Sequence, residues 1–299
     1  MNDAIGVIGL GNIGSSIAML LVRNGFEVVG FDLRAEAIEE LESVGGRAAG
    51  SAEAVAKASG VVITSLPSDA ALDDVLDEVG PHIAGAVLIE TSTLSLEAKS
   101  SAHDRVVAAG GQIVDCPLSG TAMQARQGDV IAYVSADDGV IPRVRSVIEG
   151  FTRASYELGD YGTATKMKLI ANLLVAVHNV ATAEALVLAQ KAGLDLDSAV
   201  KVLGDGAGSS RMLQVRGPMM ANGTYDEPGM NVGVFMKDVA IISAYAQELG
   251  SPTPLLSSSA PIYAAALAHG WSTSDTASVY AVLAGMANIE PTGRAEGEG

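Results

Sequence analysis

The first half of the chain alternates short apolar runs with longer amphipathic segments. The apolar runs are rich in Val and Ile, which is typical of strands buried on both faces of a parallel sheet. They lie at residues 5–10, 27–31, 61–65, 86–90 and 112–115, and closing strands are predicted at 131–135 and 155–158. Helices are predicted between them, at residues 15–24, 35–44, 52–58, 70–79 and 96–109. This alternation predicts an α/β domain with a doubly wound sheet.

The pattern changes after residue 162, because the β-branched runs stop and only helical periodicity remains. Helical segments are predicted at residues 163–192, 196–204, 209–220, 232–249, 253–269 and 276–287. We therefore expect two domains, an N-terminal α/β domain at residues 1–162 and an all-α C-terminal domain at residues 163–299.

Charge is distributed unevenly over these two parts. The 299 residues include 18 basic and 35 acidic side chains, for a net charge of −17. Residues 1–162 hold 10 basic and 23 acidic side chains, and residues 163–299 hold 8 and 12. Such an acidic surface repels phosphate backbones and anionic lipids, so we expect neither nucleic acid nor a membrane as a partner. The weakly charged helical part is expected to form the interface of a homodimer or homotetramer.

Cysteine and histidine usage narrows the chemistry. The single cysteine, Cys116, allows no intrachain disulfide and fits a reducing, cytoplasmic setting. The four histidines are scattered without the spacing of metal ligands, so no metal site is expected. No basic segment precedes the N-terminal apolar run, which is predicted to be the first strand rather than a secretory signal.

A glycine-rich turn, GLGNIG, follows the first predicted strand and opens a helix. Gly9 permits a tight turn, Gly11 lets the backbone approach a pyrophosphate, and Gly14 allows close packing of helix on strand. Asp32 follows at the end of the next strand, where a carboxylate accepts hydrogen bonds from a ribose. The pattern predicts a Rossmann-type dinucleotide site. Its turn contacts are expected from Gly9, Leu10, Gly11, Asn12, Ile13 and Gly14.

The residue at the end of the second strand also bears on the choice of cofactor. The Asp32 carboxylate repels a 2′-phosphate and so favours NAD over NADP. Arg34 keeps NADP open, because a guanidinium two residues on can pair with that phosphate. The alternative for Arg34 is a solvated position at the start of a helix.

Four segments together resemble the β-hydroxyacid dehydrogenases, a family that includes 3-hydroxyisobutyrate dehydrogenase, tartronate semialdehyde reductase and, more distantly, 6-phosphogluconate dehydrogenase. They are GLGNIG at residues 9–14, DCPLSGT at 115–121, GTATKMKLIAN at 162–172 and FMKD at 235–238. They occur in the family's order and span most of the chain. The resemblance implies an NAD(P)-dependent oxidoreductase that interconverts a small hydroxy acid with its semialdehyde or keto form.

Lys168 and Asn172 are four residues apart on a predicted helix, so their side chains share one face. The helix is too apolar to lie exposed, and a low-dielectric cleft would lower the pKa of a lysine toward neutrality. By resemblance, Lys168 is the general acid/base and Asn172 orients the reacting hydroxyl. Ala171 departs from the family, which carries a second Asn there, or a His in 6-phosphogluconate dehydrogenases. That departure argues against phosphogluconate as substrate.

A loop after a predicted strand is the expected substrate site. Ser119, Gly120 and Thr121 offer a hydroxyl and successive backbone N–H groups that can hold a carboxylate; in similar enzymes this loop binds the acid group. Thr121 stands where the family usually has Gly, so its side chain is expected to narrow or re-aim the pocket. Arg211 is a candidate for a second anionic group on the substrate, with a salt bridge as its alternative role.

Further residues are expected beside the cofactor because they match family segments that border it. These residues are Leu66, Pro67, Thr93 and Lys237. Capping and turn formation are the alternative roles for the first three, and an exposed ion pair with Asp238 is the alternative for the last.

Two other functions stay open at this point. One is a related oxidoreductase of an imine or a bulky alcohol, against which Lys168 argues, since such relatives typically replace the lysine. The other is a non-catalytic dinucleotide-binding module, which the Lys168 and Asn172 pair argues against.

Overall fold

The computed structural model describes residues 4–226 and 228–289. The chain divides into two compact units, Met1–Lys168 and Leu169–Gly299. The long helix α8 (Thr163–Lys191) contributes its first residues to unit 1 and the remainder to unit 2.

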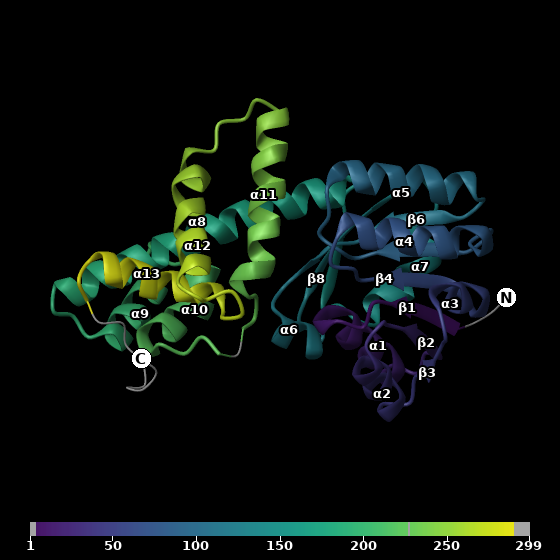
Figure 1. Cartoon of the computed structure of the whole chain (residues 1–299), viewed down its shortest axis with the longest axis horizontal. Helices are drawn as coiled ribbons and strands as arrows, with labels where there is room; N and C mark the ends of the chain where they lie inside the picture. The colour runs from purple at the N-terminus through teal and green to yellow at the C-terminus, as the bar shows by residue number, and fades with distance from the viewer. Residues whose placement is uncertain (1–3, 227, 290–299) are drawn as a thin grey trace. The chain divides into compact units, whose positions relative to one another are not determined.

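Unit 1 is built on one sheet that has nine strands within the described residues (Figure 1). The strands lie in the order β3-β2-β1-β4-β5-β6-β8-β7, and β9 pairs with β8. Their bounds are β1 Ala4–Ile8, β2 Val28–Phe31, β3 Arg47–Ala48, β4 Ser59–Thr64, β5 Val87–Glu90, β6 Gln112–Asp115, β7 Leu118–Ser119, β8 Ile131–Ala136 and β9 Ala154–Glu157. The six strands β3, β2, β1, β4, β5 and β6 run parallel to one another. Strand β8 is antiparallel to both β6 and β7. The strand order reverses at β1, so the doubly wound sheet is confirmed.

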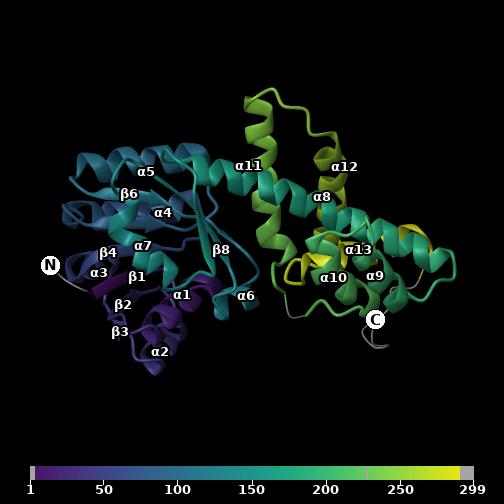
Figure 2. The same cartoon turned by 180° about the vertical axis from the view of Figure 1, so that it is seen from behind.

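Helices cover both faces of this sheet (Figure 2). Those of unit 1 are α1 Asn12–Arg23, α2 Ala35–Ser43, α3 Ala52–Ala58, α4 Asp69–Val79, α5 Leu96–Ala108, α6 Ala122–Arg126 and α7 Ile141–Glu149, with a short 3₁₀ turn at Gly80–His82. Helices α1 and α7 pack on one face, and α3, α4 and α5 pack on the other.

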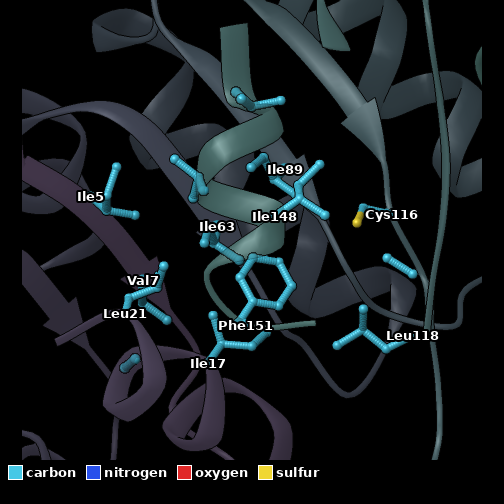
Figure 3. Close-up of a cluster of buried hydrophobic side chains, with 14 of the residues drawn as sticks. Ile5, Val7, Ile17, Leu21, Ile63, Ile89, Cys116, Leu118, Ile148 and Phe151 are labelled. Atoms are coloured by element: carbon cyan, nitrogen blue, oxygen red, sulfur yellow. The ribbon is translucent and has the colours of Figure 1, made fainter. Parts of the chain in front are cut away.

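Alternate residues of each central strand enter opposite cores. Ile5 and Val7 of β1 face Ile17, Leu21 and Phe151 on the α1 side (Figure 3). Ala4 and Ile8, the flanking residues of the same strand, belong to the core under α3, α4 and α5. Both faces are therefore buried, which explains why the strands are continuous apolar runs rather than alternating patterns.

The structure contains elements that the hydrophobic pattern did not predict. Strands β3 and β7 are two residues each, too short to produce a period, and are formed only by pairing with β2 and β8. Helix α7 does carry a helical stripe, with Val144, Val147 and Ile148 buried, but the β-branched residues in it obscure the signal.

Unit 2 is helical throughout its described residues, which confirms the predicted fold class. Its helices, after α8, are α9 Leu196–Asp205, α10 Arg211–Asn222, α11 Val232–Glu248, α12 Pro254–Ala268 and α13 Val279–Met286, with a 3₁₀ turn at Thr276–Ser278. Helices α11 and α12 lie side by side (Figures 1 and 2).

Helix α8 supplies the centre of this unit's core. Leu169, Ala176 and Leu186 are buried in it against aromatic residues of α11 and α12. The Asn179 amide donates to the Tyr263 hydroxyl at 3.1 Å and to a backbone carbonyl at 2.8 Å. By length and composition α8 could cross a membrane. A core helix of a soluble protein passes the same test, and the packing of α8 in the helical unit accounts for its apolar composition.

A buried ion pair joins α10 to the segment before α13. Arg216 and Asp275 are 3% and 1% exposed, and the guanidinium Nε donates to Asp275 Oδ1 at 2.9 Å. The same carboxylate accepts backbone N–H bonds from Gly229, Met230 and Ala277 at 2.8–3.2 Å. One side chain thus organises three segments that are distant in sequence.

We expect Arg216→Met to lower the free energy of unfolding by about 3 kcal/mol, because it leaves the Asp275 charge buried without its cationic partner. Arg153→Met is the matched control, since it removes an exposed ion pair with Asp129 (2.7 Å) and should cost no more than about 0.5 kcal/mol. Urea denaturation followed by circular dichroism measures both. Equal small losses in the two variants would contradict an organising role for Arg216.

Candidate active site

The predicted dinucleotide turn connects β1 to α1, at the edge of the sheet where the parallel strands end. Gly9 has φ +86°, and a Cβ there would collide with the Ser65 carbonyl oxygen. A Cβ on Gly14 would collide with the Gly9 carbonyl oxygen. Both positions therefore require glycine, so that α1 can start close against β1.

The start of α1 has the features of an anion site. Gly11 is the N-cap residue, and no side chain of the described residues caps this helix. A Cβ at Gly11 would meet nothing within 4 Å, so the space in front of the first turn is open. N–H groups at a helix start, with the positive end of the helix dipole, bind phosphate oxygens. The residues present thus fit the pyrophosphate of a dinucleotide.

Asp32 follows β2 and is held beside the same turn. Its Oδ2 accepts from the Leu10 N–H at 2.7 Å and its Oδ1 accepts from the Arg34 N–H at 2.9 Å. Burial alone would raise the pKa of Asp32, but the hydrogen bonds from Arg34 and Leu10 and the Arg34 charge outweigh it, so the pKa is lowered. The carboxylate is therefore ionised at neutral pH, as the recognition of ribose hydroxyls requires.

The Arg34 side chain forms hydrogen bonds with the turn and with Asp32. Its Nε donates to Asp32 at 3.2 Å and its Nη2 donates to the Leu10 carbonyl at 2.9 Å, although 59% of the side chain is exposed. The guanidinium thus holds the Asp32 carboxylate beside the turn.

The remaining unit 1 residues predicted beside the cofactor follow the ends of β4 and β5. Leu66 and Pro67 come after β4, and Thr93 after β5. The Leu66 N–H donates to the Ser92 hydroxyl at 2.8 Å, so the two loops are joined directly. Because β4 lies between β1 and β5, these loops and the glycine turn are at the same end of neighbouring strands.

The predicted substrate loop carries a cap that the sequence reasoning did not include. Ser119 ends β7 and pairs with Ile131 of β8. The Thr121 hydroxyl accepts from the Gln124 N–H at 3.3 Å, and the Gln124 side chain accepts from the Thr121 N–H at 2.9 Å, a capping box on α6. The Thr121 side chain therefore caps a helix, and its N–H is already engaged. This leaves the Ser119 hydroxyl and Gly120 N–H as the loop's donors toward a carboxylate.

Helix α8 carries the two predicted catalytic side chains. Lys168 and Asn172 are 7% and 5% exposed, whereas Lys166 is exposed, in line with the expectation that Lys166 is a solvated residue. The first turn of α8 is bound by Asp115 of β6, which accepts from the Thr165 N–H and hydroxyl, both at 2.7 Å. Lys168 therefore follows a helix end that is bound to the sheet.

Asp238 is the residue that sequence reasoning missed. Within unit 2, the Asn172 Nδ2 donates to Asp238 Oδ2 at 2.8 Å, and Asp238 is 3% exposed. An ionised carboxylate only accepts hydrogen bonds, so the contact determines which way the Asn172 amide faces. The signal was present in the FMKD segment, where only Lys237 was assigned a role.

The last two predicted site residues lie on helices of unit 2. Lys237 of α11 is 32% exposed and lies 3.8 Å from Asp238, the ion pair given as its alternative role. Arg211 begins α10, is exposed, and donates to Gln214 at 3.4 Å rather than to a carboxylate. Each therefore keeps part of its side chain accessible to a ligand.

The environment of Cys116 argues for packing rather than nucleophilic chemistry. Burial raises the pKa of the Cys116 thiol, and the Asp115 charge raises it further. The thiol is therefore neutral and lies in the apolar core (Figure 3). No group of three His, Cys, Asp or Glu side chains within the described ranges is placed to hold a metal ion.

Comparison with known proteins agrees with this geometry. Residues 4–159 match the model for the NAD-binding domain of 6-phosphogluconate dehydrogenase, and residues 162–283 match the NAD-binding model of NADP-dependent 3-hydroxyisobutyrate dehydrogenase. The L-threonate dehydrogenase of Cupriavidus necator is 30% identical over 301 residues, which cover 99% of this chain and 100% of that protein.

Solved structures show the same likeness. A 3-hydroxyisobutyrate dehydrogenase of Salmonella typhimurium superposes with a TM-score of 0.85 at 29% identity, covering 93% of this chain and 99% of that one. The enzyme of that name from Mycobacterium tuberculosis, described with L-serine, gives 0.86 at 27% identity, covering 95% and 99%. The fold and site define an NAD(P)-dependent oxidoreductase acting on CH–OH groups. The chain belongs to the β-hydroxyacid dehydrogenase family.

The glycine turn can be tested by two substitutions that differ in the space available. We expect Gly11→Ala to leave the melting temperature within about 2 °C, since its Cβ meets nothing, but to weaken NADH binding at least about tenfold by filling the approach to α1. Gly80→Ala is the matched control, because that Cβ also meets nothing and Gly80 follows α4, at the opposite edge of the sheet from the turn. Fluorescence titration with NADH measures the affinity. Unchanged affinity in Gly11→Ala would place the dinucleotide elsewhere.

Proposed function

We propose that this protein is an NAD-dependent dehydrogenase or reductase that interconverts a small hydroxy acid with its semialdehyde or keto form, with Lys168 as general acid/base. The observation that carries the proposal is a buried lysine four residues before a buried asparagine on one helix, in a chain with a dinucleotide turn. A buried lysine without a role is rare, because desolvation of its charge is costly.

The chemistry divides between cofactor and side chains. When bound, NAD would supply the hydride acceptor or donor for the carbinol carbon, and the glycine turn with Asp32 would hold it. Lys168, as the neutral amine, takes the hydroxyl proton as the carbonyl forms, and as the ammonium it gives that proton back to the oxygen. Such proton transfer contributes about 10²–10⁴ in rate.

Asn172 and the substrate loop supply orientation. With its Nδ2 held by Asp238, the Asn172 amide presents one fixed set of polar atoms to the hydroxyl that reacts at Lys168. The Ser119 hydroxyl and Gly120 N–H hold the substrate carboxylate, and Arg211 takes a second anionic group where the substrate has one. Fixed orientation of this kind lowers the entropic part of the barrier.

Names of related enzymes support the substrate class. Relatives are called L-threonate dehydrogenase, 2-(hydroxymethyl)glutarate dehydrogenase and 2-hydroxy-3-oxopropionate reductase. Each name denotes an acid that carries a hydroxyl or carbonyl near its carboxylate. We propose a substrate of this kind for the present chain.

Exposed apolar side chains support a proposal for the assembly, and the single cysteine supports one for the location. Apolar side chains of unit 2 that are strongly exposed include Leu188, Val202, Leu255 and Met286, at 65–72%. We propose that helices of this unit form the contact between copies in a homodimer or homotetramer, and that the protein works in the cytoplasm.

The role of Lys168 is tested by Lys168→Met with Lys166→Met as the matched control on the same helix. We expect the first to lower kcat at least a hundredfold while the NADH dissociation constant stays within about threefold, and the second to leave both unchanged. Absorbance at 340 nm over a panel of hydroxy acids and semialdehydes measures turnover. Retention of turnover within tenfold in Lys168→Met would refute the assignment. Binding of NADH without turnover of any panel member would favour a non-catalytic module.

Cofactor preference is tested at Asp32. We expect Asp32→Ala to lower the ratio of kcat/KM with NADH to that with NADPH at least about tenfold, since a hydrogen bond to a charged group contributes about 1.5–3 kcal/mol and the repulsion of the 2′-phosphate is lost. Glu36→Ala, an exposed acid in the first turn of α2, should leave the ratio unchanged. A ratio below one in the parent protein would overturn the choice of NAD.

A further inference from the structure

Lys99, in the middle of α5, is fully buried between two carboxylates. Its ammonium Nζ donates to Asp115 Oδ1 at 2.9 Å and contacts Glu90 Oε2. Glu90 and Asp115 end β5 and β6 and are directly paired in the sheet register. Burial alone would lower the pKa of Lys99, but Asp115 and Glu90 together raise it above its usual value. The lysine is therefore charged and balances two negative charges that would otherwise repel each other.

Both oxygens of Asp115 also bind the start of α8. Thr165 donates its N–H to Oδ2 and its hydroxyl to Oδ1, both at 2.7 Å. Ser135 of β8 adds a hydrogen bond to Oδ2 at 3.5 Å and accepts the Ala164 N–H at 3.0 Å. Lys168 follows Thr165 by three residues, less than one helical turn. The first turn of α8 is held by this anchor, and Lys168 lies in the next turn.

Glu90 makes the corresponding contact with the cofactor loops. Its Oε1 accepts the Ser92 N–H at 2.8 Å, and the Ser92 hydroxyl accepts the Leu66 N–H at 2.8 Å. Leu66, and Thr93 next to Ser92 in the chain, are among the residues proposed to border the cofactor. One ammonium group therefore holds both the carboxylate that fixes these loops and the carboxylate that fixes the start of α8.

Stability alone is a poor explanation for this arrangement. Well-packed apolar side chains often stabilise a core as much as a buried ion pair does, because the charges must be desolvated. Charged and hydrogen-bonded groups also fix the orientation of their neighbours, because each carboxylate is held with its lone pairs facing defined N–H and O–H donors.

We propose that Lys99 is a positioning residue for the reaction, which sets the acid/base Lys168 relative to the cofactor loops through Asp115 and Glu90. The proposal rests on the function proposed for Lys168. Lys99 itself does not contact substrate or cofactor, and its influence on catalysis passes through Thr165 on one side and Ser92 on the other.

A substitution that leaves Lys99, Asp115 and Glu90 in place gives the mildest test. Thr165→Val keeps the shape and the backbone N–H bond but removes the hydroxyl bond to Asp115. We expect kcat to fall about ten- to hundredfold with NADH affinity unchanged, because a small misplacement of a catalytic group has effects of that size. Thr165→Ser should restore kcat. Thr182→Val is the matched control, a 5% exposed threonine on α8 whose hydroxyl bonds its own helix.

Lys99→Met tests the centre of the network by a measurement that does not depend on activity. We expect hydrogen–deuterium exchange, followed by mass spectrometry, to become faster in peptides that contain Ser92 and Thr165, whose N–H groups bond the two carboxylates. Exchange in α12 of unit 2 should not change. Arg105→Met, on the same helix but in exposed ion pairs with Asp73 and Asp77, is the control. If Lys99→Met does not fold, the Thr165 series decides the matter.

The outcomes separate the two proposals. Full activity in Thr165→Val, or activity equally lost in Thr165→Ser and Thr182→Val, would overturn the positioning role while leaving Lys168 as acid/base. Unchanged exchange at both Ser92 and Thr165 in folded Lys99→Met would overturn it as well. Retained turnover in Lys168→Met would refute the proposed function, and the positioning proposal would then fail with it even if exchange had changed.

Discussion

The ammonium of Lys99 between Glu90 and Asp115 is the interaction on which the arrangement of unit 1 depends. Two carboxylates end neighbouring parallel strands in the middle of an apolar sheet, where neither can be solvated. Lys99 places one cation against both of them, and the same two side chains accept hydrogen bonds from Ser92 and Thr165. Through these two groups the loop after β5 and the first turn of α8 are bound to the sheet.

Helix α8 extends this constraint into the helical unit. Its first turn is anchored to Asp115, the following turns present Lys168 and Asn172, and the distal part packs in the core around Tyr263. Asn172 is in turn held by Asp238 of α11. The same helix thus forms part of the helical core and carries the proposed acid/base. This double role explains why it is long and apolar and yet contains a buried Lys and a buried Asn.

Much of the fold could be predicted from hydrophobic pattern, because strands buried on both faces and amphipathic helices leave clear signals in order along the chain. Short elements such as β3 and β7 could not, since two residues have no period and exist only through their partners. The glycine turn with Asp32 was also recognisable, because the positive φ of Gly9 and the close approach of Gly14 to the Gly9 carbonyl are local constraints that favour glycine. Asp238 lay within a segment already singled out, yet nothing in spacing linked it to Asn172, 66 residues away.

The sequence by itself determined the class of fold, the dinucleotide turn and the pair of side chains on α8, since each follows from local sterics, periodicity or helical spacing. Only the tertiary structure decided which partners hold those elements in place. Lys99 has the pattern of an ordinary helical lysine, and Thr121 the pattern of a pocket residue. In the folded chain the first is buried between two carboxylates, whereas the second caps α6 with Gln124, three residues on, a local pattern that the sequence reasoning overlooked. Hydrogen-bond partners are chosen by proximity in space, and that proximity arises only when β5, β6 and α8 come together.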